Sequence, residues 1–321
     1  MASRTIYVHT GHAKTGTSYL QASLAISVDA LASHGIAYPL SEAEIERVRT
    51  GGISSGNGMP DPNHLRTLID RNDETLLISS EALFPRMQFE GLLEVMQEAA
   101  PEADFEMLLY VRDPMDHAVS KYQQQVKRGG SIQTFDEFLD SYDHLRKVRN
   151  FIRRTENQGC SVKILNYSRH RNDLIASFEA MLNLPESVLR QPQIGQINRS
   201  MTAGEIALQM AFNRNMGARV GYLVSDPLCE KLPEIRSERP RATPAALNTF
   251  LERMKFLINE YGFDERYGEA EKYHLPTIED AAAKFSSPDQ KPVFRFGVDQ
   301  LEVLVCSLSD AIEQKESKKL R

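Results

Sequence analysis

The stretch VHTGHAKTGTSYLQ, residues 8–21, decides the fold class of this chain. It continues a β-rich run at residues 4–10, turns through Gly11–Gly16, and opens a helical pattern at Thr17. A glycine-containing loop between a strand and a helix exposes backbone amides beside the helix N-terminus, where anions bind. The stretch therefore predicts an α/β fold with a loop that binds a phosphate-like group. The alternative is a glycine turn that only connects the strand to the helix.

The lysine of this loop is not where nucleotide triphosphatases have it. A Walker A loop places lysine directly before the Ser/Thr, whereas here Thr17 holds that position and Lys14 lies two residues before Gly16. The Walker lysine reaches the β- and γ-phosphates, and the following Ser/Thr holds magnesium. The displaced lysine therefore argues against ATP or GTP bound with its metal.

Three further strand patterns follow, at about 75–80, 105–112 and 161–167, and each is followed by a helical pattern. Strands that alternate with helices predict a parallel sheet, with ligands at the carboxyl ends of the strands. The first helical pattern runs without a break from residue 17 to a stop at Gly35.

Beyond residue 185 the strand signal fades, and residues 202–217 and 244–262 have helical patterns. We therefore expect an α/β core at 1–190 and a mainly helical part at 191–321 packed on it, within one domain overall. The Gly-, Ser- and Pro-rich segment 49–63 is typical of a mobile loop, either a lid or a plain surface loop. The last residues, 313–321, are expected to form a frayed, solvated tail.

The composition excludes several function classes. The 321 residues are 41% hydrophobic and 26% charged with a net charge of −6, which is typical of a globular protein and argues against a general nucleic-acid binder. Cys160, Cys229 and Cys306 are too widely spaced for a disulfide framework or a zinc site. The sequence has no run of about 18 consecutive apolar residues, so it does not suggest a membrane-spanning helix. We expect a cytoplasmic protein that binds a small ligand, no nucleic acid and no metal.

The loop resembles that of sulfotransferases that use 3'-phosphoadenosine 5'-phosphosulfate (PAPS), especially bacterial carbohydrate-type members with G-x-x-K-T-G-T-[ST]-x-L-Q. A second element, VRDPMDHAVSKY at 111–122, is similar to the family's R-[ND]-P-x-x-x-x-x-S-x-Y. The resemblance spans about residues 5–185. It implies a P-loop fold and transfer of a sulfuryl group from PAPS to a hydroxyl of a carbohydrate or glycolipid, with adenosine 3',5'-bisphosphate (PAP) as product and no metal.

The same resemblance implies roles for individual residues. Lys14 would contact the oxygen that bridges phosphorus and sulfur. Other loop residues would supply amide and hydroxyl donors to the phosphosulfate: Thr15, Gly16, Thr17 and Ser18. Arg112 and Ser120 would bind the 3'-phosphate. Tyr167 would lie near the adenine, with a buried core tyrosine as an equal alternative. In QINRSMTAGE, Arg199 would lie near the cofactor.

The acceptor hydroxyl must lose its proton as it attacks sulfur, and a carboxylate or a histidine can accept that proton. Glu81 follows the strand pattern at 75–80, where the family places its base, although the helix macrodipole also favours a glutamate at a helix N-terminus. His12 in the loop is the rival base, with lining of the phosphosulfate site as its other role. His117 is expected to pack or cap.

Two other function classes stay open at this point. A P-loop nucleotide kinase would need a magnesium-binding carboxylate, and a non-catalytic protein would bind PAP or another nucleotide without transfer. Lys127 and Arg128 have two interpretations, contact with an anionic acceptor or a solvated helix end.

Overall fold

The computed structural model describes residues 4–87, 91–193, 199–218, 220–263, 268, 271–286 and 295–319, with side chains as far as residue 314. The contacts divide the chain into two compact units. The first unit holds Met1–Pro114, Asp143–Gly195 and Phe256–His274, and the second holds Met115–Tyr142, Gln196–Lys255 and Leu275–Arg321. The boundary expected at residue 190 stays a prediction. Among the described residues, no helix has both the length and the apolar character that a membrane crossing needs.

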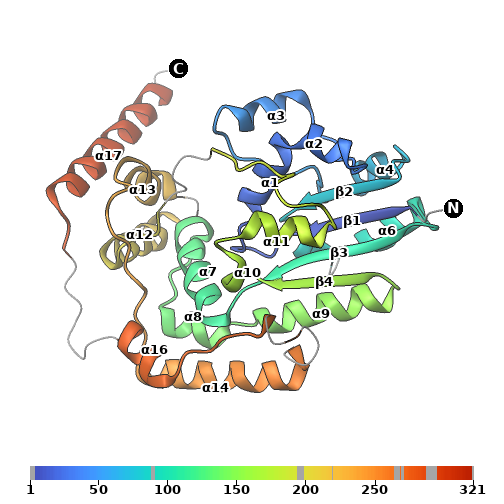
Figure 1. Ribbon diagram of the computed structural model, residues 1–321. Coiled ribbons are helices and arrows are strands. Elements are labelled where there is room, and N and C mark those ends of the chain that lie inside the picture. The colour runs from blue at the N-terminus through green and yellow to red at the C-terminus, as the bar shows by residue number, and fades with distance from the viewer. Residues whose placement is uncertain are drawn as a thin grey trace. The chain divides into compact units, whose positions relative to one another are not determined.

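The first unit is built on a four-stranded parallel sheet in the order β2-β1-β3-β4 (Figure 1). The strands are β1 Thr5–Thr10, β2 Thr75–Ser80, β3 Asp104–Val111 and β4 Ser161–Asn166. All four lie within one or two residues of the predicted runs, so the α/β prediction is confirmed. Because β2 and β3 flank β1 on opposite sides, the strand order reverses between β1 and β3. In open parallel sheets this is where ligands bind.

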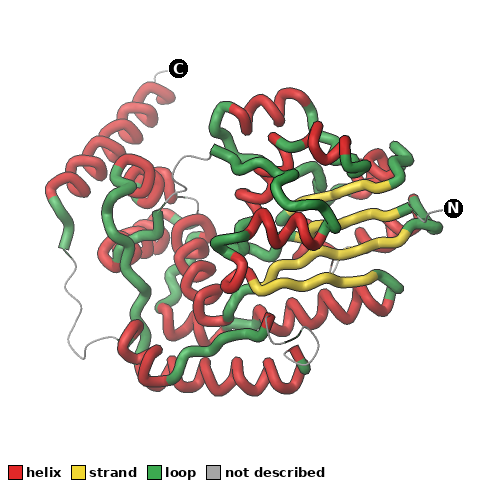
Figure 2. Tube along the Cα trace, viewed as in Figure 1, coloured by secondary structure: helices red, strands yellow, loops and turns green. Residues whose placement is uncertain are grey.

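Helices cover the sheet because its strands are apolar on both faces. Ile6 and Val8 are fully buried on one face, and Leu77, which is in register with Tyr7, is fully buried on the other. Burial on both faces is typical of parallel strands between helices. The helices of this unit lie on either side of the strands (Figure 2). On one face, Leu20 and Phe178 belong to a single apolar cluster. They come from helix α1, Thr17–Ile26, and helix α11, Leu174–Met181.

The uninterrupted helix expected from residue 17 to Gly35 is wrong. Two helices are present, α1 and α2 (Val28–Ser33), and Ser27 between them has φ −113° and ψ 13°. The Ser27 hydroxyl accepts a hydrogen bond from the backbone N–H of Arg190 at 2.8 Å, and Ser23 donates to the Arg190 carbonyl at 2.6 Å. Serine side chains that form hydrogen bonds to backbone groups can favour a non-helical conformation. The break at Ser27 therefore coincides with its hydrogen bond to Arg190, 163 residues later in the chain.

The segment expected to be a mobile loop at 49–63 lies against β2. It joins α3, Glu42–Arg49, to α4, Pro62–Ile69. Asn57 is buried, donates to the Leu77 carbonyl at 2.9 Å and accepts from the Ser79 N–H at 2.8 Å. These bonds satisfy backbone groups at the edge of the sheet, which would otherwise be open to pairing with another chain.

The remaining helices have the following bounds. In the first unit they are α5 Leu83–Met87, α6 Leu92–Ala99, α9 His144–Asn157 and α10 Tyr167–His170. The others are α7 Pro114–Gly129, α8 Phe135–Ser141, α12 Ala203–Met216, the 3-10 turn η1 Gly221–Leu223, α13 Ser225–Lys231, α14 Pro244–Tyr261, α16 Ile278–Phe285 and α17 Val298–Lys319.

The two helices predicted after residue 185, α12 and α14, are confirmed. Thr202 starts α12 with a capping box in which its side chain and that of Glu205 cap each other's backbone N–H. The frayed tail expected at 313–321 is wrong for its backbone, because α17 continues to Lys319.

Arg199 holds elements of the second unit together. Its guanidinium forms two 2.7 Å hydrogen bonds to the fully buried carboxylate of Glu205 and donates to the carbonyls of Ser200, Leu228 and Leu232. Burial opposes ionisation of Glu205, but the bonds from Arg199 outweigh it and keep the pKa of Glu205 below its usual value. These bonds use all five guanidinium N–H groups. No donor is left for the cofactor contact that the resemblance implied.

His9 makes the stability of the first unit sensitive to acid. It lies in β1, is 1% exposed, and its Nδ1 is 2.9 Å from the Ser79 hydroxyl. Burial lowers the pKa of His9 from 6.5 to about 4. The unfolded chain therefore binds the proton more tightly, and the free energy of unfolding should fall by about 2 kcal/mol from about pH 7.5 to about pH 5 through this group.

Chemical denaturation across this pH range measures the effect. His9→Gln should flatten the pH dependence of the unfolding free energy, whereas the same change at the exposed His34 should leave it as in the wild type. An unchanged pH slope in His9→Gln would contradict the assignment.

Candidate active site

The carboxyl ends of β1 and β2 bring the loop Gly11–Gly16, here called the glycine loop, against Glu81. The Gly11 N–H donates to the Ser80 carbonyl at 3.2 Å. A Cβ on Gly11 would lie 2.9 Å from the Glu81 Cα and 2.5 Å from a Thr17 side-chain carbon, so only glycine fits there without a shift. Glu81 is half-buried and directly follows β2. The predicted base candidate thus adjoins the start of the predicted anion loop.

The glycine loop has an unusual backbone at Lys14. Lys14 has φ 69° and Gly16 has φ 76°, both in the left-handed region. Glycine tolerates this region, whereas a lysine there is uncommon and typical of functional loops. The Thr15 hydroxyl donates to the His12 carbonyl at 2.5 Å and closes the turn. Gly16 has no side chain to cap α1, so the first amides of the helix can bind a ligand.

Arg112 and Tyr167, from the ends of β3 and β4, complete this cluster. Arg112 Nη1 donates to the Lys14 carbonyl at 3.0 Å, and its guanidinium carbon lies 5.5 Å from the Tyr167 ring centroid. A Cβ on Gly16 would lie 2.9 Å from Tyr167 Cε2. Three segments singled out in the sequence, the glycine loop, Arg112 and Tyr167, therefore meet at one edge of the sheet. Tyr167 is half-buried beside the loop rather than enclosed in the core.

Two polar atoms in this cluster suit an anionic ligand. The Thr17 hydroxyl and Arg112 Nε are buried and have no hydrogen-bond partner among the described residues. An unsatisfied buried donor costs about 1–3 kcal/mol. A ligand rich in acceptor oxygens, such as a phosphate or sulfuryl group, would remove that cost. Thr15 and Thr17 are buried in the loop and its helix, and Ser18 is half-buried.

Asp113, at the end of β3, forms hydrogen bonds to the end of β4 and to the segment that contains His274. Its Oδ1 accepts hydrogen bonds from the Asn166 amide and from the His274 N–H, both at 2.9 Å. The Glu271 carboxylate accepts from the Asn166 backbone N–H and lies 2.9 Å from His170 Nε2. Sequence reasoning missed this support, because no local pattern relates a glutamate to a strand end that lies about a hundred residues earlier.

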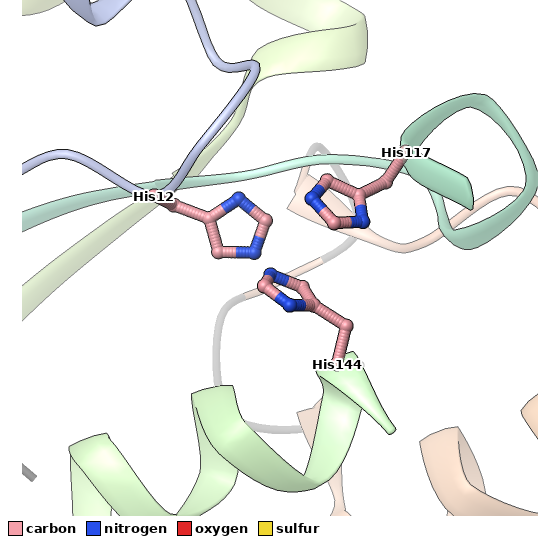
Figure 3. Close-up of side chains that lie close together, drawn as sticks. All are labelled: His12, His117 and His144. Atoms are coloured by element: carbon pink, nitrogen blue, oxygen red, sulfur yellow. The ribbon is translucent and has the colours of Figure 1, made fainter. Parts of the chain in front are cut away.

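His144 is a second residue that the sequence analysis missed. It is the first residue of α9, and its ring faces that of His12 with centroids 3.8 Å apart (Figure 3). Phe84 packs at 5.4 Å from the buried His12 ring. A nitrogen of His12 and one of His144 lie within 4.8 Å of each other. The expectation of no metal stays a prediction.

Ser120 and His117 belong to the second unit, and His117 is the third side chain that Figure 3 labels. Ser120 is half-buried on α7. The expected binding of one phosphate by Ser120 and Arg112 stays a prediction. His117 is fully buried, and its Nδ1 lies 2.9 Å from the Tyr142 hydroxyl, which confirms that it packs within its unit.

Lys127 and Arg128, at the end of α7, both pair with one carboxylate of the second unit. The distances to the Asp226 oxygens are 3.6 Å from Lys127 and 2.5 Å from Arg128. The sequence analysis expected either contact with an anionic acceptor or a solvated helix end, and it did not include Asp226 as a partner. The ion pairs link the end of α7 to α13.

Comparisons with known proteins give little information on this chain. No protein-family model and no curated protein matches the sequence. Among solved structures, the chain is similar to the sulfotransferase domain from the curacin biosynthetic pathway. The identity is 13%, the match covers 79% of this chain and 98% of that one, and the TM-score is 0.34. A TM-score this low does not establish a shared fold, and the α/β assignment follows from the strand order itself.

Proposed function

We propose that this chain is a PAPS-dependent sulfotransferase that acts on a hydroxyl of a carbohydrate or glycolipid. The observation that carries the proposal is the position of Lys14. It lies inside an anion loop at the β1/β3 reversal, its backbone is in the left-handed region, and its carbonyl is bound by Arg112. This arrangement suits one phosphate that bears a charged group rather than a triphosphate with magnesium.

The proposal assigns each part of the cofactor to particular residues. The 5'-phosphosulfate is held by Lys14 and by the amides and hydroxyls of Thr15–Ser18. Arg112 and Ser120 bind the 3'-phosphate. In the described structure Arg112 uses Nη1 on the Lys14 carbonyl, which leaves Nε and Nη2 as donors. A guanidinium can thus order the loop and bind a phosphate at once. Tyr167 offers its ring to the adenine.

PAPS supplies an activated sulfuryl group whose acceptor is an alcohol. The acceptor oxygen bonds to sulfur in line with the departing bridging oxygen, its proton passes to the base, and PAP leaves. Glu81 is the proposed proton acceptor, with the buried His12 as the rival. Lys14 donates to the bridging oxygen and stabilises the negative charge that grows there. Neither role needs a metal ion.

The first prediction concerns binding. PAP should stabilise the chain in the presence of EDTA, by about 2.7 kcal/mol at 100 times its Kd, because ligand bound only to the folded state adds its binding free energy. ATP with magnesium should add little, because the glycine loop lacks the Walker lysine. Differential scanning fluorimetry with each ligand at equal concentration measures both effects.

Other results would favour the rival functions. Stabilisation by ATP that exceeds that by PAP, or a strict need for magnesium, would favour a nucleotide kinase. PAP binding without transfer of labelled sulfur from PAPS to any glycan, glycolipid or phenol pool would indicate a non-catalytic binding protein. Label in phenols alone would remove the carbohydrate assignment and keep the sulfotransferase.

A further inference from the structure

The second unit contains a cavity of about 360 Å³ that the proposed sulfuryl chemistry does not use. Its wall is formed by apolar side chains from three helices: Tyr122 on α7, Phe135 on α8, and Ile206 and Met210 on α12. Pro240 also lines it. Volumes of about 300–1,000 Å³ are typical of small-molecule sites, so this cavity suits a small ligand with an apolar body.

The apolar wall carries charge of a single sign. Arg214, in the last turn of α12, and Arg241 line the cavity, and both are exposed. Among the described lining residues there is no aspartate, glutamate, histidine or lysine. Two guanidiniums at an apolar cavity complement a ligand with one anionic end, since arginine binds carboxylates through paired N–H groups.

The acidic residues next in sequence to this wall are used in other contacts. The Glu137 carboxylate accepts from the Thr134 N–H at 2.7 Å in the capping box of α8. Asp136 binds the Thr243 N–H and hydroxyl, and Glu238 accepts from the Ala203 N–H at 2.9 Å. None of the three lines the cavity. The two arginines are therefore its source of charge.

The polar end of Tyr122 is also used elsewhere. Its hydroxyl donates to the Gln133 carbonyl at 3.1 Å and also lies 3.6 Å from Met210 Sδ, so the hydroxyl is already used by protein atoms and the ring faces the cavity. Met210 adds an unbranched side chain that adapts to ligands of irregular shape. The apolar side chains of the wall can therefore contact the body of a ligand, and the two arginines can bind its head group.

We propose that this cavity binds a medium-chain carboxylate, with the alkyl chain against Phe135, Ile206 and Met210 and the carboxylate between Arg214 and Arg241. All residues named belong to the second unit, so the inference does not depend on the proposed sulfuryl transfer. Burial of the chain supplies the affinity, at about fourfold in Kd for each buried CH₂ group, and the arginines supply selectivity for an anion.

Isothermal titration of the full chain with octanoate tests the proposal, with 1-octanol and butyrate as matched ligands. Octanoate should bind saturably, 1-octanol about tenfold more weakly because it lacks the charge, and butyrate more weakly still because it lacks the chain. Arg214→Gln and Arg241→Gln should each weaken octanoate about tenfold. Arg236→Gln, an exposed arginine of the same unit outside the cavity, should bind as the wild type does.

Ala207→Trp provides a test that leaves the charges in place. Ala207 is half-buried and lines the cavity, so an indole there should fill the space and abolish octanoate binding. The melting transition of each variant checks that it is folded. Any of three results would overturn the proposal: no binding of octanoate below about 1 mM, equal affinity for 1-octanol and octanoate, or wild-type affinity in Ala207→Trp.

Discussion

Replacing Glu81 by glutamine should lower sulfuryl transfer by about 100- to 10,000-fold while PAP binds with unchanged affinity. Glutamine keeps the shape of glutamate and removes the proton acceptor. Glu81 is half-buried, follows β2, and its backbone lies against Gly11 of the glycine loop. In the proposed mechanism the carboxylate accepts a proton from the acceptor and does not contact PAP, so PAP affinity should not change.

The measurement is transfer of labelled sulfur from PAPS to the responding glycan pool at saturating PAPS, together with a PAP titration. Glu74→Gln is the matched control, because Glu74 is exposed and precedes β2 at the amino end of the same strand. Turnover near the wild-type rate in Glu81→Gln would remove Glu81 from the mechanism. His12→Gln would then test the rival base, which lies in the loop itself.

Replacing Lys14 by alanine should weaken PAPS binding and also lower turnover at saturation by about 100- to 1,000-fold. In the proposed mechanism the ammonium group contacts the cofactor in the ground state and meets more negative charge on the bridging oxygen in the transition state, so its removal should affect both steps. Alanine meets the same disfavoured φ of 69° as lysine does. The backbone cost therefore stays similar, and the loss reports on the side chain.

Lys14→Arg separates charge from shape. It keeps the positive charge and should retain more PAPS affinity than Lys14→Ala, although turnover should fall because a guanidinium is larger and planar. Titration with PAPS and the sulfur-transfer assay measure the two effects, and a melting curve checks that the loop variants are folded. Wild-type turnover in Lys14→Ala would show that the loop amides suffice and that Lys14 has another role.

Much of the first unit could be predicted because its signals are local. A buried strand between helices leaves an apolar run, and a glycine loop between strand and helix leaves Gly11 and Gly16 at fixed positions. Parallel strands end at one edge, so the residues after β1, β2, β3 and β4 lie along the same edge of the sheet. The placement of Glu81, Arg112 and Tyr167 at this edge follows from that rule.

The contacts that hold the site together were decided by the tertiary structure. The Arg112 bond to the Lys14 carbonyl spans 98 residues, and the Asn166 bond to Glu271 spans 105. His144 reaches His12 from the start of a helix that gave no functional signal. Each partner is an ordinary polar residue in its own segment, so no local pattern distinguishes it.

By itself, the sequence determined the strand ends, the glycine loop and the order of the elements, because hydrophobic periodicity and glycine conformations depend on neighbours a few residues away. Only the tertiary structure decided the break at Ser27, the seating of Asn57 against β2 and the arginine-lined cavity of the second unit. These features arise from hydrogen bonds and packing between segments far apart in the chain, which are satisfied only once the segments are brought together.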